Sequence, residues 1–115
     1  MEEFFNLNNE IVIYRSEDGK TRLDVKLEGD TVWLSQQQMS ELFEKDRTVI
    51  GRHIRNIFKE GELQESLVCA KFAHTAEYRK SYNTLFHNLN AIISVGYCVN
   101  SIRATQFRQW VTYIL

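Results

Sequence analysis

Proline is absent from the 115 residues, glycine occurs only five times, and no apolar run approaches the roughly 20 residues that a membrane-spanning helix needs. The missing proline and the lack of low-complexity tracts exclude a proline-rich linker inside the chain. The opening segment, MEEFFNLNNE, is acidic where a secretory signal would carry basic residues. The sequence therefore predicts a cytoplasmic protein with no membrane partner.

Cysteine is also scarce, and its two copies, Cys69 and Cys98, are far apart in the sequence. Neither belongs to a CxxC motif or to the Cys/His spacing of a zinc site, which argues against a disulfide framework and a structural zinc. Both lie within apolar runs, VCAKF and VGYCV. We therefore expect two reduced, buried thiols that react slowly with thiol reagents.

Catalytic motifs are missing as well. The three histidines, His53, His74 and His87, are not spaced like metal ligands, and the chain has neither a glycine-rich phosphate loop nor a nucleophile motif. We therefore expect no enzymatic activity, no cofactor and no metal. One alternative stays open, because Cys69 and His87 could meet in space if the strands that carry them are neighbours.

The charge is small in total and uneven in its distribution. The formal net charge of −1 argues weakly against nucleic-acid binding, which depends mostly on neutralising phosphates. However, residues 78–115 contain no carboxylate, and neither do residues 47–59. The basic residues of these two segments are Arg47, Arg52, Arg55, Lys59, Arg79, Lys80, Arg103 and Arg108. Local charge decides what a phosphate group meets, so both segments are candidates for nucleic-acid contact.

Length and composition predict one globular domain over residues 1–115. With 43% hydrophobic and 25% charged residues, the chain can bury a single core and is too short for two ordinary domains. The last helical pattern, residues 101–115, reaches the end of the chain without a capping signal. We therefore expect the N-terminal fragment of a longer protein, with an exposed apolar stripe formed by Phe107, Trp110 and Ile114.

Short alternating or apolar runs predict strands in both halves of the chain. Asp18 and Gly19 supply the turn of an N-terminal hairpin, and a polar segment at residues 74–81 supplies the turn of a second hairpin. The predicted strands are residues 11–14, 22–27, 31–34, 67–72 and 82–86. After the second hairpin, residues 89–96 read as a helix that Gly96 closes.

Between the hairpins, residues 35–60 have the pattern of a helix-turn-helix. Ser35 and Gln38 form a capping box at the start of a first helix, residues 35–43. A second, longer helix covers residues 48–59, with Gly61 placed to end it in the left-handed conformation. Glu44 stands where such turns often have glycine. Two core helices with a solvated basic face would produce a similar pattern, and this interpretation stays open.

If the second helix enters the major groove, its N-terminal and outward residues reach base edges. Arginine can bind guanine O6 and N7 together, and an exposed Gly51 would allow close approach to DNA. Lys59 is expected to meet phosphate. The predicted base-reading residues are Arg47, Thr48, Gly51, Arg52 and Arg55. Arg79 and Lys80, at the tip of the second hairpin, are predicted as a wing that contacts the backbone of the duplex, whereas the N-terminal hairpin is read as solvated strands.

Three stretches of the chain together resemble the RhuM family. They are EIVIYRSEDGKTRLDVKLEGDTVWLSQQQMSELF, IGRHIRNIFKEGEL and KSYNTLFHNLNAIISVGYCVNSIRATQFRQW. The resemblance implies a bacterial, virulence-associated protein that is often carried on mobile elements and regarded as DNA-binding. Members usually have a small residue near Ala104, as here, and an arginine near Cys98, which this chain lacks. The segment 89–110 is also distantly similar to Bro-N type DNA-binding domains.

These observations predict an α+β fold: a winged helix-turn-helix-like domain with an N-terminal hairpin, a second hairpin and C-terminal helices. The predicted function is sequence-specific binding of double-stranded DNA, as a regulator on a mobile element. The alternative is a protein-interaction module that uses the apolar last helix. That helix would contact a second copy or the remainder of a longer chain.

Overall fold

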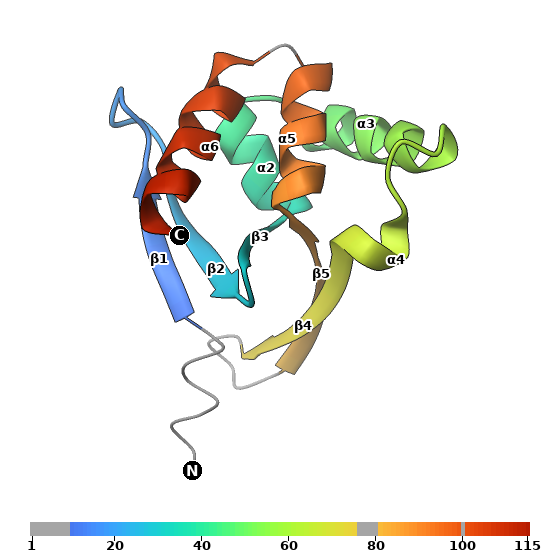
Figure 1. Cartoon of the computed structure of the whole chain (residues 1–115), viewed down its shortest axis with the longest axis horizontal. Helices are drawn as coiled ribbons and strands as arrows, with labels where there is room; N and C mark the ends of the chain where they lie inside the picture. The colour runs from blue at the N-terminus through green and yellow to red at the C-terminus, as the bar shows by residue number, and fades with distance from the viewer. Residues whose placement is uncertain (1–9, 76–80, 100) are drawn as a thin grey trace.

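A computed structural model describes residues 10–75, 81–99 and 101–115 (Figure 1). Within these ranges the chain forms five antiparallel strands and five helices, so the predicted α+β class is confirmed. The elements are β1 (Glu10–Arg15), β2 (Arg22–Glu28), β3 (Thr31–Ser35), α2 (Gln36–Phe43), α3 (Arg47–Lys59), α4 (Glu65–Val68), β4 (Cys69–Thr75), β5 (Ser81–Asn88), α5 (Leu89–Cys98) and α6 (Ile102–Ile114). Arg79 and Lys80, the predicted wing residues, lie outside the described residues.

The five strands form one sheet in the order β1-β2-β3-β5-β4. Gly19 and Gly29 adopt positive φ angles of 77° and 68° in the turns that follow β1 and β2, which explains the glycines there. β3 then pairs with β5, with Leu34 opposite His87. The sequence predicted the strands of the two hairpins but not the β3–β5 pairing, which joins them into a single sheet.

Several of the predicted boundaries differ from the structure, and two of these differences have a clear structural reason. β4 begins at Cys69 and not at residue 67, because residues 65–68 form the short helix α4. α5 continues through Gly96 to Cys98, so Gly96 does not end the helix. A Cβ atom on Gly96 would lie 2.3 Å from the Cβ of Ala104. The glycine therefore allows α5 and α6 to pack closely.

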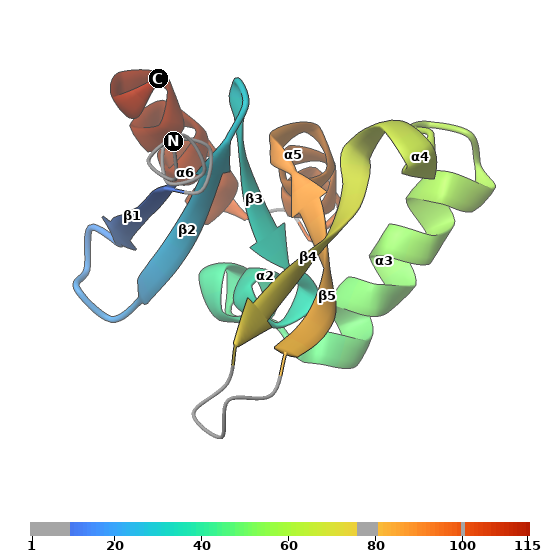
Figure 2. The ribbon, with the colours of Figure 1, turned by 90° about the horizontal axis from the view of Figure 1, so that it is seen from below.

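One face of the sheet carries α2, α5 and α6 (Figures 1 and 2). Alternate side chains of β2 and β3 point to these helices, because successive residues of a strand point to opposite faces. The core between the two layers contains Val25, Val32, Leu34, Met39, Leu42, Ile92, Val95 and Phe107, all fully buried. α3 packs beside this layer, against α2 and α5.

The predicted apolar stripe of the last helix is not exposed, and this prediction was wrong. Phe107 is fully buried, while Trp110 and Ile114 pack against the core. The ring of Tyr14 in β1 lies 5.1 Å from that of Phe107 and 5.0 Å from that of Trp110. The N-terminal hairpin covers the stripe, which periodicity within α6 alone could not reveal. Tyr113, on another side of α6, is an exposed aromatic residue, with 88% of its surface accessible.

Arg103 connects three elements at one point. Its guanidinium donates hydrogen bonds to the carbonyl oxygen of Leu42, to Thr21 Oγ1 at 2.5 Å and to Asp18 Oδ2 at 3.2 Å. The same group lies 3.7 Å from Glu44 Oε1. These contacts tie the start of α6 to the N-terminal hairpin and to the end of α2, so Arg103 stabilises the fold.

In the part of the chain that the structure describes, no helix combines the length and the apolar character that crossing a membrane requires.

Candidate nucleic-acid interface

Local hydrogen bonds define the turn between α2 and α3. The capping box of Ser35 and Gln38 is present, as predicted, and α2 ends where Glu44 takes the left-handed conformation with φ of 55°. The backbone N–H of Lys45 donates to the carbonyl of Ser40 at 3.1 Å, and Ser40 Oγ donates to the carbonyl of Lys45 at 2.7 Å. Glu44 thus adopts a conformation that usually favours glycine. Ser40 therefore stabilises the turn through two hydrogen bonds to the backbone of Lys45.

α3 starts and ends at well-defined caps. The Asp46 carboxylate accepts hydrogen bonds from the backbone N–H and the hydroxyl of Thr48, and these two bonds lower the pKa of Asp46. At the other end Gly61 has φ of 78°, as predicted, and the N–H of Glu62 donates to the carbonyl of Ile57. The helix therefore has a fixed length and a fixed N-terminal end.

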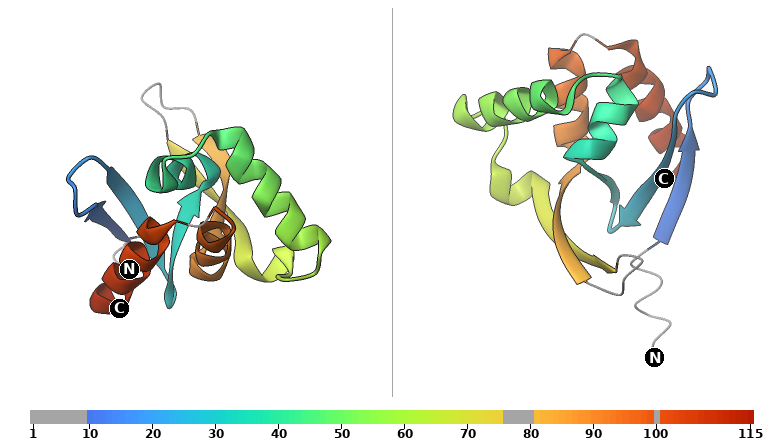
Figure 3. Two further views of the ribbon diagram at one scale, coloured as in Figure 1. Left: turned by 90° about the horizontal axis from the view of Figure 1, so that it is seen from above. Right: turned by 180° about the vertical axis from the view of Figure 1, so that it is seen from behind.

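One side of α3 is buried and another is basic. Ile50, Ile54 and Ile57 point into the core. At about 100° per residue, the exposed Thr48, Arg52, Arg55 and Lys59 fall within a window of about 60° on the helix surface. We call these four residues the α3 stripe. In both views of Figure 3, α3 lies on the opposite side of the helices from α6 and β1, so the helix stands at one flank of the molecule.

The cations of α3 differ from those of the N-terminal hairpin in their partners. In the hairpin, Arg22 lies 3.4 Å from Asp24 and Lys26 lies 3.7 Å from Glu28. Among the described residues, none of the α3 cations forms an ion pair. An unpaired surface arginine can bind a phosphate or a base without first losing a carboxylate partner.

The structure divides the predicted base-reading residues into two groups. Arg52 and Arg55 are exposed on the α3 stripe, whereas Gly51 is buried, so its predicted exposure was wrong. A Cβ on Gly51 would lie 2.7 Å from Nε2 of Gln36, and the same amide donates to the carbonyl of Arg47 at 3.0 Å. Gly51 therefore makes room for a bond between α2 and α3, and not for DNA.

Sequence reasoning missed the part played by Gln36. The capping box explained Gln38, and nothing in the pattern distinguished Gln36 from the two glutamines that follow it. The position of Gln36 against α3 depends on the angle between the two helices. Without that angle, a polar side chain at the start of a helix does not indicate which residue it contacts.

Two adjoining hollows lie between α3 and β5. The larger, of about 510 Å³, is lined by Gln36, Gly51, Ile54, Arg55, Phe58, Lys59, Glu65, Leu85 and His87. The smaller, of about 190 Å³, is lined by Ser35, Gln36, Gln37, Arg47, Thr84, Leu85 and His87. Because Gln36, Leu85 and His87 line both, the hollows form one depression, which we call the α3–β5 groove. Arg55 and Lys59 belong both to this groove and to the α3 stripe.

Cys69 and His87 do meet, on the paired strands β4 and β5, and His87 lines the groove. The Sγ atom of Cys69 lies 3.1 Å from Nδ1 of His87. Burial raises the pKa of the Cys69 thiol to about 11, with a smaller contribution from Glu65, and burial lowers the pKa of His87 to about 4. Both groups are therefore neutral near pH 7, whereas a nucleophilic Cys/His pair requires a thiolate.

The predicted burial of both thiols is correct only in part. Cys69 is half-buried, but Cys98 is exposed near the end of α5. Partial burial, together with the carboxylates of Glu62 and Glu60, still raises the pKa of Cys98. The run VGYCV is apolar in sequence, yet its helical geometry turns Tyr97 and Cys98 outward. Apolar neighbours along the chain therefore did not identify the buried face.

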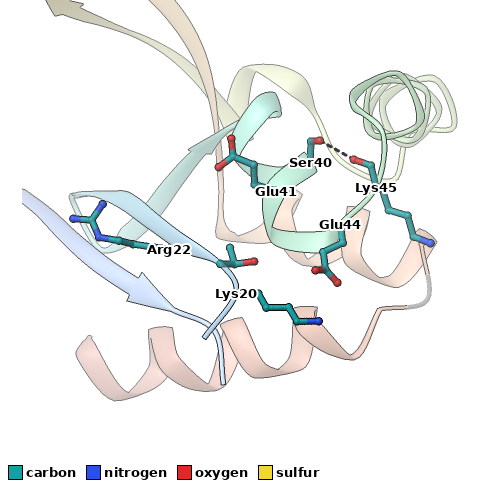
Figure 4. A pocket seen from close by; sticks show the side chains of 7 residues that line it. Lys20, Arg22, Ser40, Glu41, Glu44 and Lys45 are labelled. Carbon is teal, nitrogen blue, oxygen red and sulfur yellow. Dashed lines mark hydrogen bonds between the residues drawn. The ribbon is translucent and has the colours of Figure 1, made fainter. Parts of the chain in front are cut away.

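A further hollow, of about 500 Å³, lies between the N-terminal hairpin and α2. Side chains of both signs line it, and Figure 4 shows Lys20, Arg22 and Lys45 around it together with Glu41 and Glu44. The bond between Ser40 and Lys45 closes the turn beside it. A surface that carries both positive and negative side chains does not favour an extended polyanion. This hollow is therefore a weaker candidate for nucleic-acid binding than α3.

Comparison with known proteins finds one family model that matches part of the chain. The model of the family described as virulence protein RhuM family matches residues 67–115. The match supports the predicted family assignment over a segment that contains β4, β5, α5 and α6. No curated protein and no solved structure matches the chain. The matched segment does not include α2 and α3, so the comparison does not bear on the α3 stripe.

Proposed function

We propose that the protein binds double-stranded DNA, on the basis of the α3 stripe and of the match of residues 67–115 to the virulence protein RhuM family. In this proposal α2 and α3 act as a helix-turn-helix, with α3 in the major groove. The protein acts as a sequence-specific regulator and not as an enzyme. The neutral Cys69–His87 pair is consistent with that second statement, because neither group is ionised for nucleophilic attack.

The α3 stripe is the observation that carries the proposal. Three cations without carboxylate partners share one exposed face of a helix whose opposite face is in the core. A helix in the major groove presents one face to the base edges and meets phosphates on both sides of the groove. Arg52 is assigned to a guanine, and Lys59, at the end of the helix, to a phosphate.

Other elements have supporting roles in this proposal. The bond from Gln36 to the carbonyl of Arg47 and the Asp46 cap hold the first turn of α3 in place. Thr48 shares its hydroxyl with Asp46, so its methyl group is the part available for a thymine. Arg79 and Lys80 remain assigned to the backbone of the duplex as a wing. The interaction-module alternative loses its main support, because the apolar stripe of α6 is covered.

Fluorescence anisotropy with a labelled duplex tests the proposal. After a preferred site has been selected from a random pool, Arg52→Ala should cost about 1–3 kcal/mol on that site and relax the preference at one base pair. Lys59→Ala should weaken binding to all sequences alike and reduce the slope of affinity against salt by about one.

Arg108→Ala is the matched control, because Arg108 is exposed on α6, away from α3. It should leave both affinity and salt slope close to those of the parent. Melting temperatures must first show that all three variants are folded. If Arg52→Ala and Lys59→Ala bind DNA like the Arg108→Ala control, α3 is not the reader and the proposal fails.

A further inference from the structure

The α3–β5 groove has the shape and lining of a small-molecule site. We propose that it binds a small organic anion with an apolar body, such as an aryl sulfonate or aryl carboxylate. Its larger part, of about 510 Å³, falls within the range of roughly 300–1,000 Å³ that is typical of ligand sites. Such sites combine mostly apolar walls with a few polar groups that set the orientation of the ligand.

The walls of the groove supply the apolar contact. Ile54 and Phe58 line it from α3, and Leu85 lines it from β5. Leu85 is 36% exposed although it lies on the face of the sheet that points to α3, because nothing in the described structure fills the space above it. An apolar ligand body would remove this surface from water, and that removal would stabilise the complex.

The rim determines the sign of the ligand charge. Arg55 and Lys59 line the larger hollow and Arg47 lines the smaller, against a single carboxylate, that of Glu65. Glu65 begins α4, which leads directly into β4, so it lies toward the sheet side of the groove. The α3 side is therefore positive, and an acidic group of the ligand is expected beside Arg55 and Lys59.

His87 gives the groove a fixed polar group. The side chain is only 2% exposed, and its Nδ1 atom is bound to Cys69, which fixes the orientation of the ring. Nε2 is the ring nitrogen that remains for a hydrogen bond with a ligand. Because burial lowers the pKa of His87, the ring is neutral and adds no charge to the site at pH 7.

A ligand in the groove would share Arg55 and Lys59 with DNA. If DNA binds the α3 stripe, the two should compete, and the protein would then release DNA when the ligand is present. This consequence rests on the proposed function. Binding of the anion itself does not.

The fluorescent probe 1-anilinonaphthalene-8-sulfonate has an apolar aromatic body and one sulfonate. Titrated into the full chain at pH 7, it should bind saturably to one site. Leu85→Asp places a carboxylate in the groove and should weaken binding by at least about tenfold. Leu67→Asp is the control, because Leu67 is 71% exposed and does not line the groove. It should bind the probe as the parent does.

Near-ultraviolet circular dichroism identifies variants that have lost their packing, in which this probe binds non-specifically. If the folded parent shows no saturable site, or if Leu67→Asp weakens binding as much as Leu85→Asp, the groove is not a ligand site. A duplex is then added to the probe complex. Displacement supports the shared use of Arg55 and Lys59. Probe binding as expected, with no binding of any duplex, would retain the groove and refute the proposed function.

Discussion

Arg103 is a charged residue that belongs to the framework of the fold, whereas the other arginines that the structure describes face solvent. The sequence placed it among the basic residues that are candidates for nucleic-acid contact, yet its guanidinium bonds to the carbonyl of Leu42 and to Thr21. These partners come from α2 and from the N-terminal hairpin. Spacing along α6 gives no information about them, because both contacts cross more than sixty positions of sequence.

Removing Arg103 should therefore destabilise the fold. Arg103→Ala leaves buried acceptors without their charged donor and should lower the free energy of unfolding by about 2–4 kcal/mol. Arg108→Ala, on the exposed face of the same helix, should change it by less than about 0.5 kcal/mol. Urea denaturation measures both. Equal effects of the two substitutions would show that the Arg103 contacts do not contribute.

His87 should make stability depend on pH. Burial lowers its pKa from 6.5 to about 4, so the unfolded chain binds a proton in a range where the folded chain does not. The stabilisation is complete above pH 6.5 and is lost as the pH falls toward 4. The expected loss is at most about 3 kcal/mol.

Urea denaturation between pH 7 and pH 4 measures this loss, and His87→Gln should remove it. Asp18 acts in a different range. Hydrogen bonds from Ser16 and the backbone of Lys20 lower its pKa from 3.8 to about 2, so its contribution is lost only below pH 3.8. A parent protein whose stability is constant from pH 7 to pH 5 would contradict the assigned burial of His87.

At the scale of elements, the glycines of α3 and α5 lead to opposite expectations. A methyl group on Gly96 would meet Ala104 and the ring of Phe43, which the core holds in place, so Gly96→Ala should destabilise the fold by about 1–3 kcal/mol. On Gly51 it would meet the flexible ends of the Gln36 and Arg55 side chains, and helix propensity favours alanine. Gly51→Ala should stay within about 1 kcal/mol of the parent. Thermal unfolding distinguishes them, and a reversed order would contradict the packing described.

The sequence predicted the elements whose signals are local. The capping box of Ser35, the left-handed Gly61 and the alternation over Arg22–Val25 in β2 each depend on neighbours within a few residues, and all are present. The alternation does not continue to Lys26, which is buried. The sequence did not predict what lies against each element. Three features depend on residues far away in sequence. They are the β3–β5 pairing that joins the hairpins, the cover of α6 by Tyr14, and the burial of Gly51.

For the candidate site the same distinction holds. Clustering of Arg52, Arg55 and Lys59 on one face follows from helical spacing alone, so the sequence was sufficient to predict it. It was not sufficient for the α3–β5 groove, because Leu85 and His87 come from a strand that the sequence could not place beside α3. Residues 76–80, which include the predicted wing, are outside the described structure.

At the scale of the whole molecule, the basic helix stands at one flank, and the N-terminal hairpin packs with α6 at the other (Figures 1 and 3). Because α3 and α6 lie on different sides, a macromolecule could contact α3 without disturbing the cover of α6. This arrangement permits DNA binding by a single copy of the chain. The proposed reader and the contacts that stabilise the fold are therefore on separate sides.

The central claim is that α3 contacts DNA, and chemical-shift mapping tests it most directly. Isotope-labelled protein is titrated with a short duplex at low salt, where non-specific binding also occurs. The amide signals of Thr48, Arg52, Arg55 and Lys59 should shift or broaden in proportion to the duplex added, while those of α6 stay in place. Shifts confined to α6 and the N-terminal hairpin, or no shifts at all, would contradict the account.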